Sequence, residues 1–319
     1  MIEYDRYFGY QHPYRDEHAG KRVVSVPLEP GEEPPDAGAV AWRLSANDWH
    51  EDIPDTIEES FDWFLAHVDT ARVTALVIGE WDECYDSDSK VIVTTLAEQA
   101  AKFPALRSIF LGAITAEEAE ISWIQQSDIT PLLAAFPKLE RLEVRGGTGL
   151  ALTPVRHEAL RVLRIETGGL GGDVVRAVAA CDLPALEHLE LWLGVGGYGG
   201  DATIEDLGPV LTGERLPSLR HLGLQDSEMQ DDIAAAVAAA PVVARLETLS
   251  LSMGALSDTG AEALLSGQPL THLRELDLHH HFLTDPMIGR LADALPGVEV
   301  RLSGQERADD RERYVAVSE

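Results

Sequence analysis

A short pattern, LxxLxL, recurs along the chain with leucine or another aliphatic residue at its first, fourth and sixth positions. Its eight copies begin at Val73, Leu106, Leu139, Leu160, Leu186, Leu219, Leu246 and Leu273, and a degenerate ninth copy begins at Val298. The eight starts are 21 to 33 residues apart, which suits a repeat of one strand and one return segment. The pattern therefore predicts a series of parallel strands.

The segments between the motifs mostly have the spacing of amphipathic helices. In residues 257–267, Ser257 or Asp258 is a candidate N-cap. In residues 284–295, Pro286 follows a cap candidate, and the apolar positions on the inward face are Ile288, Leu291, Ala292 and Leu295. The 21-residue unit that begins at Leu139 is an exception, because it has room for little more than a turn.

One repeat cannot bury its own leucines, so repeats must stack on one another to be stable. The expected fold class is α/β: a right-handed leucine-rich-repeat solenoid, or horseshoe, with parallel strands on the concave face and helices on the convex face. The period and the helices resemble the ribonuclease-inhibitor-like class of leucine-rich repeats. From about Trp42 onward, blocks such as EISWIQQSDITPLLAAFP and GQPLTHLRELDLHHH resemble an uncharacterised bacterial leucine-rich-repeat family. That resemblance implies this fold and a cytoplasmic setting, and it brings no catalytic residue with it.

Four regions are expected along the chain. Residues 1–38 contain PLEPGEEPPDAG and predict an N-terminal arm that is partly extended. Residues 39–72 predict an N-terminal cap of one strand and one helix, which would close the open edge of the first repeat. Residues 73–303 form the solenoid of eight to nine repeats, and residues 304–319 form a charged C-terminal tail. The apolar YVAV near its end leaves open whether this tail docks.

The ninth motif position departs from the usual pattern of leucine-rich repeats. Many such repeats place Asn there, whereas the single Asn of this chain, Asn47, lies outside the repeats. In the eighth repeat the ninth position is His281, which is expected to bond to backbone in place of Asn. His279 is expected on the concave face in contact with solvent, and His280 in the turn. Because neighbouring side chains of a strand point to opposite faces, these three histidines are not expected to share a metal ion.

The charge balance restricts the possible partners. Lys and Arg number 25 against 55 Asp and Glu, so the formal net charge is −30, which would repel a phosphate backbone. We therefore expect no nucleic-acid partner, and a protein or peptide partner that carries basic groups. The only cysteines, Cys84 and Cys181, favour a reducing compartment. The start of the chain is charged and aromatic, and no apolar run approaches the roughly 20 residues needed to cross a bilayer. A cytoplasmic protein with no membrane partner is expected.

The third, fifth and seventh motif positions should point from the strands into the concave face. The central repeats place three arginines of this acidic chain there, beside Trp192 as an aromatic anchor. Gly223 and Ser250 should leave a shallow depression next to it. The predicted partner-binding residues are Arg141, Arg145, Arg164, Glu166, His188, Glu190, Trp192, His221, Gln225, Asp277 and His279. The alternative is a solvated sheet face whose cross-strand charges pair with one another.

Signals for catalysis are weak. His188 and His221 occupy equivalent positions on adjacent strands, with Glu190 nearby, which could serve acid–base or metal chemistry, but no motif such as HExxH supports this. GVGGYGG has GxGxxG spacing, yet it follows a solenoid strand, so a flexible loop is expected and no cofactor. DECYDSDSK lacks the Gly and terminal Glu of a calcium loop, so a capped helix start is expected there.

These observations favour a non-catalytic scaffold that binds a protein or peptide on the concave face. The alternative is an enzyme or metal-dependent accessory factor centred on His188, Glu190 and His221.

Overall fold

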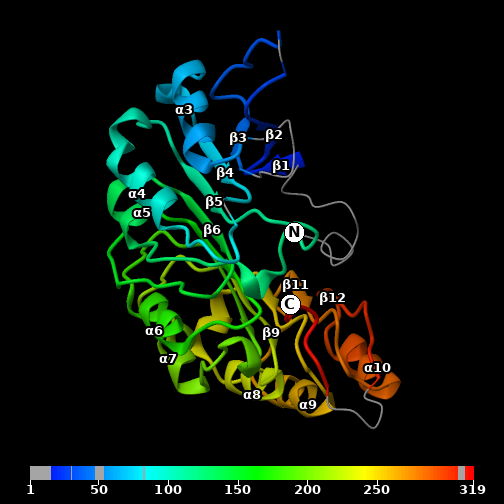
Figure 1. Ribbon diagram of the computed structural model, residues 1–319. Coiled ribbons are helices and arrows are strands. Elements are labelled where there is room, and N and C mark those ends of the chain that lie inside the picture. Colours follow the sequence, from blue (N-terminus) through cyan, green and yellow to red (C-terminus); the bar gives the residue numbers. More distant parts are fainter. Residues whose placement is uncertain (1–15, 30, 47–53, 82, 308–312) are drawn as a thin grey trace. The chain divides into compact units, whose positions relative to one another are not determined.

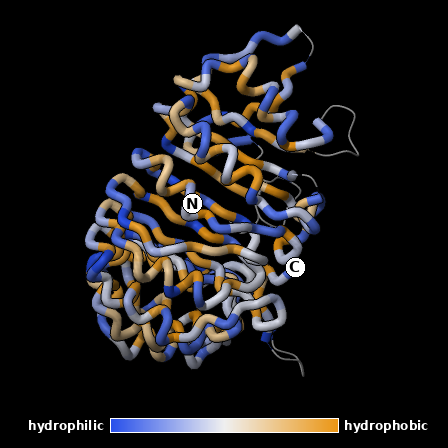
Figure 2. The backbone as a smooth tube through the Cα atoms, turned by 60° about the vertical axis from the view of Figure 1, so that its left-hand side comes forward, coloured by the Kyte–Doolittle hydropathy of each residue, from blue (hydrophilic) through white to orange (hydrophobic). Residues whose placement is uncertain are grey.

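The computed structural model describes residues 16–29, 31–46, 54–81, 83–307 and 313–319, and the chain folds into two compact units, residues 1–160 and 161–319. Each unit is an open sheet of strands that alternate with helices, as Figure 1 shows. Figure 2 shows that stretches of hydrophobic residues recur in neighbouring strands. Within the described residues, no helix is long and apolar enough to cross a membrane.

The described residues of the first unit form six strands in chain order. They are β1 (Glu17–His18), β2 (Lys21–Ser25), β3 (Ala41–Leu44), β4 (Ala75–Ile78), β5 (Ser108–Leu111) and β6 (Arg141–Arg145). β1 pairs antiparallel with β2, and every later pair is parallel. Its α-helices are α3 (Ile57–His67), α4 (Lys90–Glu98) and α5 (Thr130–Ala135), and short 3-10 helices occupy Thr70–Arg72 (η1), Ala100–Lys102 (η2) and Ile121–Trp123 (η3).

In the part of the second unit that the structure describes, six strands also follow chain order, and all are parallel. They are β7 (Val162–Glu166), β8 (His188–Gly194), β9 (His221–Ser227), β10 (Thr248–Ser250), β11 (Glu275–Asp277) and β12 (Glu299–Arg301). The α-helices between them are α6 (Gly172–Ala180), α7 (Ile204–Thr212), α8 (Gln230–Val237), α9 (Asp258–Ser266) and α10 (Asp285–Ala294), with 3-10 helices at Gly196–Tyr198 (η4) and Pro241–Arg245 (η5). Consecutive helices from α6 to α9 pack against one another, and so do α9 and α10.

Every LxxLxL motif forms a strand, as predicted, and each strand begins at the third motif position, from Ala75 in the first to Glu275 in the eighth. The aliphatic side chains at the fourth position are buried, as Leu189 and Leu222 illustrate, because they pack between the sheet and the helices. The parallel register places equal motif positions side by side: His188 pairs with His221, and Glu190 pairs with Gly223. The result is the α/β architecture of a leucine-rich-repeat-like solenoid.

The predicted helices form, with small differences in which residues they bury. Ser257 caps α9 by accepting a hydrogen bond from Thr259 N. In α10, Leu291 is buried as expected, but Ala292 is exposed and Met287 is buried in its place, so the predicted face was rotated slightly. Residues 146–161, all of them described, contain no helix, as the short unit after Leu139 predicted.

Part of the predicted N-terminal arm belongs to the sheet, because β1 and β2 lie within residues 17–25. Residues 39–72 contain β3 and α3, which buries Ile57, Phe61 and Phe64. The division into arm, cap, solenoid and tail stays a prediction, since residues 1–15, 30, 47–53 and 308–312 lie outside the described residues.

The backbone at the carboxyl ends of three successive strands of the second unit shares an unusual conformation. Asp226, Met253 and His280 all occupy the eighth motif position and all have positive φ, at 54°, 67° and 52°. This left-handed conformation turns the chain sharply out of the strand. A row of equivalent turns therefore lies at the carboxyl ends of β9, β10 and β11.

Residues 313–319, which we call the C-terminal segment, cross this row of turns. The Tyr314 carbonyl lies 3.2 Å from His280 Nε2, Ala316 N donates to Met253 O, and Val317 N donates to the Asp226 carboxylate. Val315 is buried. The apolar end of the predicted tail therefore docks on the second unit, which answers the question that its YVAV sequence left open.

Candidate functional site

The predicted partner-binding residues are divided between the two units. Arg141 and Arg145 lie on β6 in the first unit. The others lie on β7, β8, β9 and β11 or in the turn after β11, and with their neighbours they line what we call the polar face of the second unit. This face carries Arg164, Glu166, His188, Glu190, Trp192, His221, Gln225, Ser250, Asp277, His279 and Arg301.

Glu190 is the centre of a compact cluster on the polar face. Its neighbours in register are Arg164 on β7 and Gly223 on β9. A Cβ atom at Gly223 would lie only 2.9 Å from Glu190 Cγ, so the missing side chain leaves room for the glutamate. The sequence pattern placed these residues on one face but did not show that the glycine accommodates Glu190.

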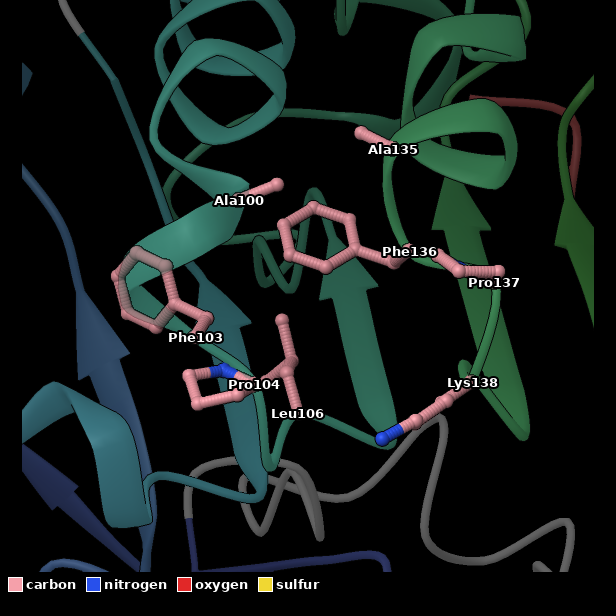
Figure 3. Close-up of a pocket in the computed structure, with 8 residues that line it drawn as sticks. All are labelled: Ala100, Phe103, Pro104, Leu106, Ala135, Phe136, Pro137 and Lys138. Atoms are coloured by element: carbon pink, nitrogen blue, oxygen red, sulfur yellow. The ribbon is translucent and has the colours of Figure 1, made fainter.

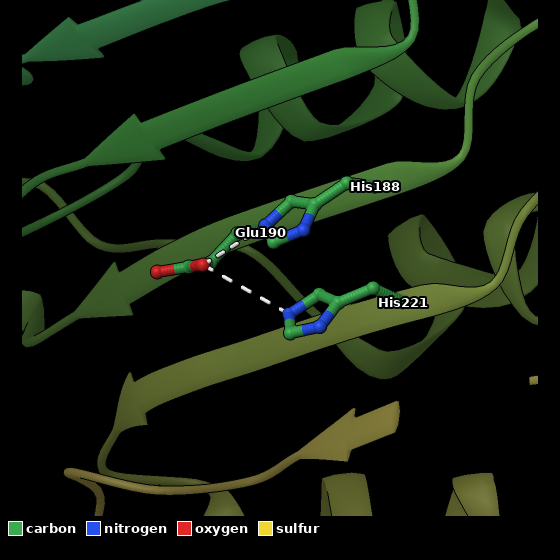
Figure 4. Close-up of side chains that lie close together, drawn as sticks. All are labelled: His188, Glu190 and His221. Carbon is green, nitrogen blue, oxygen red and sulfur yellow. Dashed lines mark hydrogen bonds and ion pairs between the residues drawn. The ribbon is translucent and has the colours of Figure 1, made fainter. Parts of the chain in front are cut away.

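The side chains of His188 and His221 both point toward one oxygen of this carboxylate (Figure 4). Their rings stack with centroids 3.7 Å apart and planes 4° apart, because the residues are paired in register on adjacent strands. His188 Nε2 lies 3.1 Å from Glu190 Oε2, and His221 Nε2 lies 3.9 Å from the same oxygen. Both rings therefore present the same nitrogen to one carboxylate oxygen, and both remain partly exposed, with 30% and 24% of their side-chain surface accessible.

The other oxygen of Glu190 is held from the opposite side. Arg164 Nε lies 3.0 Å from Oε1, and Trp192 Nε1 donates a hydrogen bond of 3.1 Å to it. Arg164 also pairs with Glu166 at 2.8 Å, and its guanidinium carbon lies 5.8 Å from the centre of the Trp192 ring. The orientation of the carboxylate is thus determined by two donors, and Oε2 faces the histidines.

The electrostatics of the cluster favour an ionised carboxylate beside a neutral imidazole. Burial acts to raise the pKa of Glu190, but the charge of Arg164 and the hydrogen bond from His188 outweigh burial and hold the pKa well below its usual value. Burial lowers the pKa of His221 to about 3, and His188 acts in the same direction. At neutral pH, Glu190 is therefore ionised and His221 is neutral.

A second polar network lies farther along the same face. Gln225 Nε2 donates to Ser250 Oγ at 2.5 Å, and Ser250 Oγ lies 3.3 Å from Asp277 Oδ2. Asp277 in turn lies 2.8 Å from His279 Nδ1. Ser250 was expected to leave a depression, but it joins the side chains of β9 and β11 instead.

Two expectations about exposure were wrong. Trp192 was predicted as an aromatic anchor for a partner, yet it has no accessible surface and binds Glu190. His279 was predicted to be in contact with solvent, yet it is 6% exposed and pairs with Asp277. In both cases charged or polar groups on the same face supply partners that periodicity does not reveal.

The three consecutive histidines have three separate sets of partners, as the register predicted. His279 contacts Asp277, and His280 lies against Tyr314 O. His281 is fully buried, with Nε2 3.1 Å from Leu302 O and Nδ1 accepting from Leu283 N. The expected backbone-bonding role of His281 is therefore confirmed.

In the first unit, the arginines of β6 mostly serve local structure. Arg141 pairs with Glu143 at 2.7 Å and is partly exposed, whereas Arg145 is buried and donates from Nε to Ile114 O. The apolar side of this sheet is covered in part by His18, whose ring lies 5.9 Å from that of Phe110. Burial, aided by Arg141, lowers the pKa of His18 to about 3.

An apolar pocket lies in the first unit beside η2 and the end of α5 (Figure 3). Its lining residues are Ala100, Phe103, Pro104, Leu106, Ala135, Phe136, Pro137 and Lys138. Lys138 is the one ionisable group among them, so the pocket lacks the combination of groups that acid–base catalysis uses.

The other two sequence motifs have structural roles. Gly194 of GVGGYGG has φ of +67°, and a Cβ there would lie 2.0 Å from Gly168 O, so this glycine permits a close approach of two segments of the chain. In DECYDSDSK, Asp88 accepts a hydrogen bond from Lys90 N at the start of α4, while Asp82 lies outside the described residues.

The fold defines a leucine-rich-repeat-like α/β protein. Among solved structures, the chain is similar to an uncharacterised Bacteroides fragilis protein determined by structural genomics, with a TM-score of 0.75 and 31% identity. The match covers 80% of this chain and 72% of that one, and the chain belongs to the family of that protein. No protein-family model and no curated protein matches the chain.

Proposed function

We propose that the protein is a non-catalytic scaffold that binds a protein or peptide on the polar face of the second unit. The observation that carries this proposal is the row of partly exposed side chains at the starts of β8, β9 and β10, namely His188, His221 and Thr248. These side chains stand beside a network of hydrogen-bonded groups that are already ordered. A surface ordered before binding loses less conformational entropy when a partner docks.

The charge of the chain indicates what kind of partner suits this face. With a net charge of −30, the protein attracts basic groups, and Glu275 and Asp277 stand near the proposed surface. A protein or peptide with Lys or Arg residues fits these features better than a nucleic acid or an anionic membrane does.

We also propose that the repeats belong to the ribonuclease-inhibitor-like class of leucine-rich repeats. The helices of eight to ten residues between β7 and β12 support this class. The buried thiols of Cys84 and Cys181 suit a reducing cytoplasm.

A single substitution tests the surface. Thr248→Arg places a positive charge at the β10 end of the row, beside His221, where it should repel a basic partner, and it replaces no residue of the charged cluster around Glu190. Immobilised wild-type and variant proteins are incubated with lysate of the native cell, and captured proteins are quantified by mass spectrometry. A specific partner should be depleted about tenfold or more on the variant, a loss of roughly 1.4 kcal/mol of binding free energy.

Thr212→Arg is the matched control, because Thr212 is exposed at the end of α7 in the helix layer. It adds the same charge away from the polar face and should leave capture unchanged. Equal capture by wild type and Thr248→Arg would show that the partner binds elsewhere.

A further inference from the structure

We infer that His188, Glu190 and His221 form a binding site for one divalent transition-metal ion of the zinc class. Each residue offers one ligand atom, and the three atoms lie within 4.8 Å of one another. Two imidazole nitrogens and one carboxylate oxygen are a ligand set that zinc sites use when a fourth position stays open. This inference goes beyond partner binding and concerns different residues from the Thr248 test.

The distances are close to those that an ion requires. At zinc bond lengths of about 2.0–2.2 Å, tetrahedral ligand atoms are roughly 3.3 Å apart. Glu190 Oε2 lies 3.1 Å from His188 Nε2 and 3.9 Å from His221 Nε2. The stacked rings must turn toward each other about their Cβ–Cγ bonds, so that both nitrogen lone pairs point at the ion. Their partly exposed edges allow this rotation.

The surroundings orient the ligands as metal sites require. Arg164 and Trp192 hold Glu190 Oε1, which leaves Oε2 directed at the histidines. Such hydrogen bonds to a ligating carboxylate fix its position and support metal affinity. Glu166 Oε1 lies 2.8 Å from Arg164 Nη2 and balances the positive charge of the arginine. The negative charge of Glu190 therefore remains to attract a cation.

One nitrogen is already available as a ligand. Among the described residues, His221 Nε2 is buried and has no hydrogen-bond partner. A buried nitrogen without a partner is costly, and a metal ion would satisfy it. At His188, a ring that carries its proton on Nδ1 would offer Nε2 to the ion, next to Glu190 Oε2. Oxygen-preferring ions such as Mg²⁺ and Ca²⁺ suit this ligand set poorly.

The test uses the full chain without a histidine tag, stripped with chelator and dialysed. Zn²⁺ is titrated by calorimetry, and Co²⁺ is titrated by its visible absorption, which reports tetrahedral ligands. We expect one ion per chain and a rise in melting temperature with Zn²⁺.

His188→Gln and His221→Gln each remove one ligand and keep a polar side chain of similar reach. Each should weaken Zn²⁺ binding about 100-fold or more, because loss of a supporting hydrogen bond alone costs about 10–100-fold. Trp192→Phe keeps an aromatic ring but removes the donor to Glu190 Oε1, and it should weaken binding about tenfold. Melting curves of the metal-free variants show that each one folds.

His272→Gln is the matched control, since His272 lies in the same unit with its Nε2 near Val243 O. It should bind Zn²⁺ like the wild type. The inference is overturned if the folded wild type binds no Zn²⁺, if both ligand variants bind it as tightly as the wild type does, or if His272→Gln loses binding equally. None of these results depends on whether Thr248→Arg changes partner capture.

Discussion

At the scale of single residues, several different side chains replace the asparagine ladder of other leucine-rich repeats. Gln126 donates to Arg145 O, Thr167 to Trp192 O, and Gln230 to Leu224 O, while His281 accepts from Leu283 N. Each buried carbonyl or amide at a turn needs a partner, and more than one side chain can supply it. Of these side chains, only His281 was predicted from the sequence to take this role.

A substitution at His281 tests this role. His281→Ala leaves Leu283 N without its acceptor and opens a gap beneath the turn, so it should lower the free energy of unfolding by about 1–3 kcal/mol. Because Leu302 and Leu283 are its partners, hydrogen exchange should increase first in residues 283–307.

His67→Ala on the exposed end of α3 is the control and should change stability by less than about 0.5 kcal/mol. If residues 283–307 of His281→Ala exchange hydrogen as slowly as those of the wild type, the His281 ring contributes packing alone.

The ion pairs of the polar face show why residue-level predictions have limits. The register placed Arg164, His188 and Glu190 on neighbouring strands of one face, and the structure does so. Which of them would be buried depends on side-chain conformations and on groups that periodicity leaves unspecified. For this reason the exposure of Trp192 and His279 was predicted wrongly, while the position of Trp192 on a strand was predicted correctly.

At the scale of elements, the strands were the most predictable part of the chain. Leucines at fixed spacing indicate both where a strand lies and which face it buries, so all eight motifs form strands as predicted. Helices were less predictable, because their apolar stripes are wide and tolerate rotation, as Met287 and Ala292 of α10 show. The pairing of β1 with β2 has no repeat signal, and it was missed.

Two glycines of the second unit should respond in opposite ways to alanine. Gly194 has positive φ and touches Gly168, so Gly194→Ala should destabilise the protein by roughly 2–4 kcal/mol. Gly289 lies within α10 with open space around it, so Gly289→Ala should stabilise by about 0.5–1 kcal/mol. Denaturant unfolding of both variants measures this difference. Equal effects at the two positions would contradict the close approach of β8 to Gly168.

At the scale of the whole molecule, each of the two compact units contains a histidine whose pKa is lowered to about 3, His18 in one and His221 in the other. Both rings stay neutral in the folded protein, whereas in the unfolded chain they take up a proton near the ordinary histidine pKa of 6.5. The unfolded state therefore binds more protons between these values, and the free energy of unfolding falls as pH decreases from about 6.5 toward 3.

Each ring should contribute a slope of at most about 1.4 kcal/mol per pH unit within this window. The low pKa of Glu190 acts in the same direction below pH 4.5, the ordinary pKa of a glutamate side chain. Urea unfolding at a series of pH values should give shallower slopes for His18→Gln and His221→Gln than for the wild type. His67→Gln serves as an exposed control. Identical slopes in all four proteins would mean that other groups dominate acid unfolding.

The C-terminal segment also limits how this protein can change in evolution. Repeat proteins diverge largely by duplicating or losing whole repeats. Residues 314–317 bond to His280, Met253 and Asp226, one in each of three successive repeats. A duplicated repeat inserted between β9 and β11 would separate two of these partners and break the contacts of the segment. The repeats from β9 to β11 should therefore be inherited as one block, with gains and losses of repeats elsewhere along the chain.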